Sequence, residues 1–236
     1  MTTFRPTVSV VQKHAGPPLW LLASLYTVLF IAGLLPVTAV GGLPYWPGPW
    51  EAPGVIVSYF QSHAVKVLAC VFLQTGATIC LGLFTAVITS RLHFLGVRAA
   101  GVQIALFGGF LTVFDGLAAG YATWATIHPA VAPNGPVLLG LYYLSFALGG
   151  PGFSVPMGLL MAGVSVTSAF RKLLPRWLIV LGLLLAAAGE LSVFYFLNPK
   201  LLFLIPLTRF PGFIWIVSVG LLMPGKRVAE QQALAA

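Results

Sequence analysis

The chain has 236 residues, of which 59% are hydrophobic and only 7% are charged, and its mean hydropathy is +0.99. Soluble domains carry about 25% charged residues, so this composition excludes a soluble globular protein and predicts an integral membrane protein. The net charge of +8 is attributed to the basic loops that orient membrane proteins, which argues against nucleic acid as a partner and for anionic membrane lipids.

Six apolar stretches are long enough to cross a bilayer, which takes about 20 residues of helix. They cover residues 19–40, 64–89, 99–121, 137–168, 177–197 and 201–223 and leave no room for a soluble domain. The first stretch is longer than the apolar part of a typical cleavable signal peptide, so we expect it to be retained. The predicted fold class is all-α: a polytopic transmembrane helical bundle of six spans in one domain.

Lys and Arg are distributed unevenly over the connections between these spans. The connections on the same side as the N-terminus hold Arg5, Lys13, Arg91, Arg98, Arg171, Lys172, Arg176, Lys226 and Arg227. Those on the opposite side hold only Lys66, Lys200 and Arg209. Because basic loops stay in the cytoplasm, we expect both termini to be cytoplasmic.

Two connections on the expected outer side are rich in Pro, Gly and aromatic residues. They cover residues 41–63 and 122–136, and such composition resists both helix and sheet. One interpretation is an interfacial cap anchored by aromatic side chains; the other is a lid over a cavity that opens outward. Under the second, Trp50, His63, Trp124 and His128 are candidates for the rim of the pocket.

The fourth stretch is too long for one straight span and contains GGPGFSVP at residues 149–156. Two prolines and three glycines predict a kink or an unwound segment. Unwound backbone at membrane depth lines cavities in transporters, which makes Ser154 a candidate ligand-binding residue; a simple proline kink is the alternative. Similarly, Pro211 and Gly212 allow the last helix to begin only there, which would place Arg209 at its mouth.

Three charged residues fall at similar depths within the expected spans. At 1.5 Å per residue, Asp115 lies about 9 Å, Glu190 about 10 Å and Arg209 about 12 Å below the outer ends of their helices. An isolated charge in this layer is costly, so we expect the two carboxylates and the guanidinium to cluster. All three are candidates for ligand binding or a proton relay.

Small and polar residues follow the second and third spans at helical spacing. Gly108, Thr112, Gly116 and Gly120 form a small-residue face beside Asp115, which predicts close helix packing and an inward-facing acid. Gln74, Thr78, Gly82, Thr85 and Thr89 form a polar stripe, with Gln74 as a further candidate ligand-binding residue. Threonines in membrane helices also bond their own backbone, so packing remains an alternative for this stripe.

Three strings in the second half of the chain carry a resemblance. They are GGPGFSVPMGLL at 149–160, LPRWL at 174–178 and LTRFPGFIW at 207–215. Their order and the hydropathy profile resemble a bacterial family of six-helix membrane proteins known only as a domain of unknown function. The resemblance implies a multi-pass protein of the bacterial cytoplasmic membrane and brings no activity or catalytic residue with it.

No signature of a catalytic, metal or cofactor site stands out. The four histidines, at positions 14, 63, 93 and 128, fall in loops or at span ends without the spacing of a helical metal or haem site. Ser154 lacks the Gly-x-Ser-x-Gly elbow of serine hydrolases. We therefore predict no cofactor, no metal and no catalytic residue, and we expect the protein not to be an enzyme.

Three functional hypotheses follow, in order of preference. The first is binding, with transport as its extension, of a small or lipid-like ligand in an outward-facing polar pocket whose floor holds Asp115, Glu190 and Arg209. The second is an accessory subunit of a larger membrane assembly, in which buried charges only register the helices against a partner subunit. The third is an intramembrane enzyme acting on a lipid or isoprenoid, with either acid as general acid or base.

Overall fold

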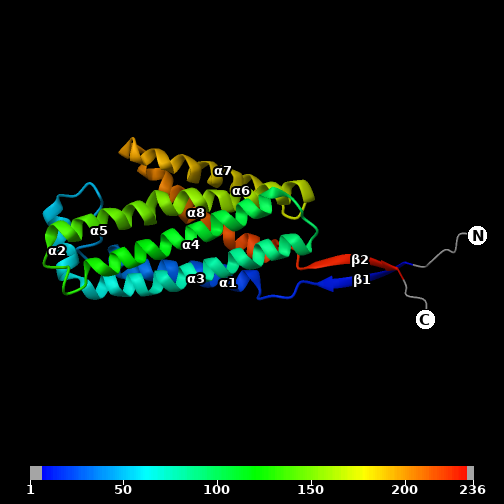
Figure 1. Cartoon of the computed structure of the whole chain (residues 1–236), viewed down its shortest axis with the longest axis horizontal. Helices are drawn as coiled ribbons and strands as arrows, with labels where there is room; N and C mark the ends of the chain where they lie inside the picture. The colour runs from blue at the N-terminus through cyan, green and yellow to red at the C-terminus, as the bar shows by residue number, and fades with distance from the viewer. Residues whose placement is uncertain (1–6, 233–236) are drawn as a thin grey trace, which may run out of the picture.

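A computed structural model describes residues 7–232, which form a bundle of long helices with a small sheet at one end (Figure 1). Within this range the helices are α1 (Leu19–Leu34), α2 (Pro53–Ser62), α3 (Ala64–Phe94), α4 (Ala100–Thr126), α5 (Gly135–Ala147), α6 (Phe153–Arg171), α7 (Arg176–Leu191) and α8 (Leu204–Leu222). Strands β1 (Thr7–Lys13) and β2 (Lys226–Gln232) pair antiparallel. Short 3₁₀ segments, η1 (Leu35–Val37), η2 (Ala39–Gly41), η4 (Ser192–Phe196) and η5 (Pro199–Phe203), extend the helices, and η3 (Leu148–Gly152) is a π-helical turn.

Six helical segments in the described chain are long and apolar enough to cross a membrane. They run over Leu19–Val37, Ala64–Phe94, Ala100–Thr126, Gly135–Arg171, Arg176–Phe196 and Pro199–Leu222. The prediction of a six-helix apolar architecture is therefore confirmed. The fourth segment is the longest, with 37 residues, because α5, η3 and α6 follow one another without a break.

The six segments close into a ring in which each helix packs against two neighbours. The order around the ring is α1, α3, α4, α6, α7 and α8, and α8 returns to α1. In an apolar 18-residue stretch of the segment that contains α6, 67% of the residues are buried, against 33–39% in the corresponding stretches of the other five segments. Small residues on α6, such as Gly158 and Gly163, make this deeper burial feasible because they let neighbouring backbones approach closely.

The sheet joins the first and last described elements at one end of the bundle, which we call the terminal end. Thr7 pairs with Gln232 and Lys13 with Lys226. Arg227 fixes the sheet to the bundle, since its Nη1 donates to the carbonyl of Phe94 at 2.9 Å. The two strands lie far from α2, which marks the opposite or cap end (Figure 1). No pattern in the sequence predicted this sheet, since the expected fold class was all-α.

The connection between the first two spans contains a helix that the composition did not predict. Pro53 occupies the first turn of α2, where its missing N–H costs nothing. Ile56, Tyr59 and Phe60 are buried and pack against Leu138 and other apolar side chains of α5, which stabilises this short helix. In this connection the long stretch without regular structure is residues 42–52, which we call the cap loop, so the irregular segment is shorter than the expected residues 41–63.

Both proline-containing segments stay helical. Around Pro151 the chain forms the wider turn of η3 and then continues as α6, so residues 149–156 are not unwound. Helix α8 begins at Leu204 and runs through Pro211, with Arg209 inside it and not at its mouth. Membrane helices in general tolerate proline where neighbouring groups compensate the backbone groups that it leaves unpaired.

Candidate functional site

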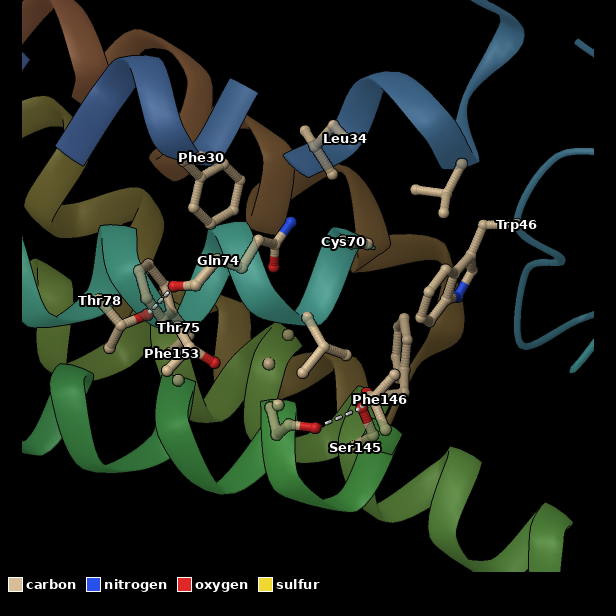
Figure 2. A pocket seen from close by; sticks show the side chains of 18 of the residues that line it. Phe30, Leu34, Trp46, Cys70, Gln74, Thr75, Thr78, Ser145, Phe146 and Phe153 are labelled. Carbon is tan, nitrogen blue, oxygen red and sulfur yellow. Dashed lines mark hydrogen bonds between the residues drawn. The ribbon is translucent and has the colours of Figure 1, made fainter. Parts of the chain in front are cut away.

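A cavity of about 270 Å³ lies inside the ring, in the half of the bundle nearer the cap end. Helices α1, α3, α4, α5 and α8, the turn η3 and the cap loop all contribute to its wall (Figure 2). Apolar side chains cover most of the wall: Phe30, Leu34, Val37, Trp46, Val71, Phe146, Phe153 and Ile205. Polar groups come from Thr38, Gln74, Thr75, Thr78, Thr123, Tyr142, Ser145 and Arg209.

Arg209 is the charged residue of this wall. Its Nη2 donates to the carbonyl of Gly149, and its Cζ lies 4.5 Å from the ring centroid of Phe153 and 5.4 Å from that of Phe30. Contact with two aromatic faces offsets part of the cost of burying a cation. Its Nε is buried and has no hydrogen-bond partner among the described residues. The guanidinium therefore has donor capacity that the described side chains do not use.

The carbonyl that receives Arg209 belongs to the π-helical turn. At the end of η3, the N–H of Phe153 bonds to the carbonyl of Gly150 and not to that of Gly149, four residues back. In a regular α-helix the bond to Gly149 would form. Phe153 thus does not use the Gly149 carbonyl, which accepts from the Arg209 guanidinium and links α8 to the GGPG sequence.

Polar side chains of α3 line the cavity beside the cation. Gln74, Thr75 and Thr78 lie within five residues of each other on α3 (Figure 2). Thr78 Oγ1 donates to the carbonyl of Gln74 at 2.7 Å, so this hydroxyl is occupied by its own helix. Across the cavity, Thr123 and Ser145 share a hydrogen bond of 2.5 Å, and Ser145 also donates to the carbonyl of Ala119.

Glycines give the cavity its width. A Cβ at Gly120 would meet only Thr75 Oγ1, at 3.6 Å, and one at Gly149 would meet the Cβ of Ala119 at 3.2 Å. Gly116 and Gly150 also line the wall. Open space next to the helix backbone is greatest at Gly120, whereas added Cβ atoms at Gly116 and Gly149 would make close contacts at 3.2 Å.

The cap loop is fixed over the cavity by hydrogen bonds to η1 and α5. The N–H of Trp46 bonds to the carbonyl of Val37 at 2.8 Å, and Tyr142 Oη donates to the carbonyl of Pro47 at 2.7 Å. The indole of Trp46 lines the cavity and packs edge-on against Phe60, with ring centroids 5.0 Å apart. Lys66 Nζ donates to the carbonyl of Gly41, just before the loop.

Of the predicted ligand-binding candidates, Arg209 and Gln74 line the cavity together. Asp115, Glu190 and Ser154 are not among the lining residues. Ser154 is fully buried in α6, where its hydroxyl has no partner among the described residues.

The two acids pack against different positions of the fourth apolar segment, which contains η3 and α6. Asp115 on α4 lies beside Gly152, where an added Cβ would be 3.6 Å from Oδ2, and Glu190 on α7 lies beside Gly158, where the distance to Oε1 would be 3.2 Å. In the ring, α6 lies between α4 and α7. The described contacts pair neither acid with Arg209, so the cluster expected from depth alone does not form in this geometry. Depth along the axis carries no information about position around the ring.

The four predicted rim residues lie outside the cavity wall. Trp50 is 70% exposed and Trp124 48% exposed. His128 packs edge-on against Trp124, and His63 stacks on Tyr59 with ring centroids 4.9 Å apart. Burial, with a smaller contribution from Cys70, raises the pKa of Tyr59 in this stack. Trp46 takes the rim position that sequence reasoning gave to Trp50.

In the described residues, no group of three or more His, Cys, Asp or Glu side chains is arranged to hold a metal ion. No family model matches the chain, and neither the curated proteins nor the solved structures gave a match. The resemblance to the six-helix bacterial family stays a prediction.

Proposed function

We propose that this chain is a multi-pass protein of the bacterial cytoplasmic membrane that binds a small or lipid-like ligand in the cavity beside Arg209. The observation that carries the proposal is a largely apolar cavity inside the ring of apolar helices, with an incompletely bonded guanidinium in its wall. Ligand pockets are usually apolar cavities with a few convergent polar groups, and their volumes are about 300–1,000 Å³. At about 270 Å³ this cavity fits a small ligand.

The proposed orientation places the termini in the cytoplasm and the cavity toward the outer face. Arg91, Arg98, Arg171 and Arg176 lie at or near the terminal end of their helices, which supports this orientation by the positive-inside rule. Ala52 and Ala99 are exposed at opposite ends of the bundle. In intact cells, a membrane-impermeant maleimide should label Ala52→Cys and spare Ala99→Cys. The unaltered chain is the control, because Cys70 and Cys80 lie inside α3; the reverse pattern would invert the orientation.

Native mass spectrometry of the gently solubilised protein tests the binding proposal. In Gly120→Val the added methyl groups fill the cavity, where a Cβ meets only an ordinary contact. Gly140→Val is the matched control, since Gly140 is a mid-helix glycine of α5 with no atom within 4 Å of an added Cβ. We expect a defined small mass on wild type and Gly140→Val that Gly120→Val lacks. An identical adduct on all three, or none on any, would contradict the proposal.

An accessory structural role is the second candidate, and the internal contacts of Arg209 favour it. A cation that bonds to Gly149 and packs on Phe30 and Phe153 also registers α8 against η3 and α1. Under this alternative, Asp115→Asn and Glu190→Gln would lower thermal stability or release a partner chain. Under the binding proposal both variants keep the small mass, because neither acid lines the cavity.

A further inference from the structure

The chemistry of the cavity wall limits which ligand it can hold. A guanidinium has five N–H donors and stays protonated in proteins. The described hydrogen bonds account for one donated contact of Arg209, to Gly149. Nε is buried without a partner, and no carboxylate of the described residues lines the cavity. Arg209 therefore brings one net positive charge to the wall, and its Nη groups have N–H donors beyond the one that bonds to Gly149.

A buried cation without an acidic partner is costly, and an anion that enters the cavity removes part of that cost. Carboxylate and phosphate groups match the guanidinium geometry best, since each can accept two parallel N–H bonds. Gln74 and Thr75 on α3 supply further polar groups in the same wall. Neither an amine nor an alcohol would satisfy this arrangement equally well.

The position of Arg209 also indicates how the ligand is oriented. The guanidinium lies against Phe30 and Phe153. From Phe30 the wall continues along α1 to Leu34, then through Val37 of η1 to Trp46 of the cap loop. A charged group next to Arg209 would thus have its apolar body directed toward the cap end.

We infer that the ligand is a small amphiphilic anion, whose carboxylate or phosphate head binds Arg209 and whose apolar body packs along α1 toward Trp46. The inference rests on the proposed function, and it specifies the chemical class of the ligand. Anionic lipid fragments and free organic acids share this chemistry.

The test compares four probes with the same eight-carbon chain: octanoate, monooctyl phosphate, octanol and octylammonium. Binding to the purified protein in a neutral detergent is measured by titration calorimetry. Micelle partitioning is equal for every variant, so differences between variants report on the site. A charge-assisted hydrogen bond contributes about 1.5–3 kcal/mol. We therefore expect the two anions to bind wild type about tenfold or more tightly than octanol. The stronger of the two anions identifies the head group.

Arg209→Gln should reduce that preference to near unity, whereas Arg209→Lys should keep part of it because the charge remains. If Arg209→Gln fails to fold, the probe series on wild type and Gly120→Val still decides, because the difference between these two chains corrects for micelle partitioning. Equal binding of octanoate and octanol, both lost in Gly120→Val, would overturn the anion inference and leave the proposed function standing. Preference for octylammonium would also overturn it. Binding of every probe unchanged in Gly120→Val, or binding of none, would overturn both.

Discussion

Glycine has opposite roles in the two halves of helix α4. In the half toward the terminal end, a Cβ on Gly108 would meet the carbonyl of Pro156 at 2.6 Å and the N–H nitrogen of Leu160 at 2.7 Å. In the half toward the cap end, a Cβ on Gly120 would meet only one side-chain atom, at 3.6 Å. The first glycine permits backbone contact with α6, and the second leaves space for the cavity.

The contrast teaches that a small-residue face in a membrane helix is not one signal. Gly101 and Gly163 continue the close α4–α6 contact toward the terminal end, whereas Gly116 and Gly120 lie in the cavity wall. Glycine in a membrane helix lets backbones approach closely only where another backbone is present. Where none is present, it widens the interior of the ring. Along α4, the terminal half is therefore built for packing and the cap half for volume.

The largest expected effect on stability comes from substituting the two compared glycines themselves. Gly108→Ala should destabilise the protein by about 3 kcal/mol, because overpacking against backbone forces the helices apart. Gly120→Ala should be neutral or stabilising by up to about 1 kcal/mol, because alanine is the better helix former. Thermal unfolding in detergent measures both. In a chain of this size, 1 kcal/mol corresponds to about 2–4 °C in Tm.

Equal decreases in Tm for Gly108→Ala and Gly120→Ala would contradict the distinction between the two halves of α4. Gly140→Ala serves as the control for helix propensity, because this exposed position of α5 has no neighbour within 4 Å of an added Cβ. Its Tm change gives the reference against which both other variants are measured.

A smaller effect concerns the cap half alone. Tyr142→Phe removes the hydrogen bond to the carbonyl of Pro47 and should cost about 0.5–1.5 kcal/mol. The cap loop should also become more mobile, so hydrogen exchange should rise in residues 42–52 and stay unchanged in α6. Tyr143→Phe is the matched control, since this neighbour is 43% exposed. Equal exchange in the two variants would mean that Tyr142 does not fix the loop.

The smallest effect concerns the terminal end. His14 Nε2 lies 3.1 Å from Ser90 Oγ, and burial together with the nearby Arg91 charge lowers the pKa of His14. A His with a lowered pKa in the folded state stabilises the fold above its unfolded pKa of about 6.5, and this contribution is lost as the pH falls below that value. Between pH 7.5 and 5.5 the Tm of wild type should fall further than that of His14→Gln. A parallel fall in both would exclude His14 as the source.

Hydropathy and length were enough to predict six apolar spans, because each span is a local property of about 20 residues. Arg209 and Gln74 were also predicted as candidates, since a polar residue within an apolar run stands out in the sequence. Trp46 did not stand out, because the cap loop contains Trp50 as well and composition cannot tell which indole turns inward. The structure separates them: Trp46 lines the cavity and Trp50 is 70% exposed.

Two further features could not be predicted, because they depend on contacts between distant parts of the chain. The expected layer of Asp115, Glu190 and Arg209 used only height along the helix axes, whereas the order of the ring places α6 between the two acids. The sheet pairs β1 with β2 across more than 200 residues, as in the pairing of Lys13 with Lys226. No turn connects these strands, so the sequence has no hairpin signal at this point.

The pairing of β1 with β2 has a consequence for biosynthesis. A ribosome makes β1 before the six spans and β2 after them. If the six helices cross a membrane as proposed, the sheet can form only once all of them have been translated and inserted, and only if an even number of crossings has brought both strands to the same face of the membrane. A chain with one span missing or inverted would have its two strands on opposite faces, so this short sheet distinguishes a completely inserted molecule from an incomplete one.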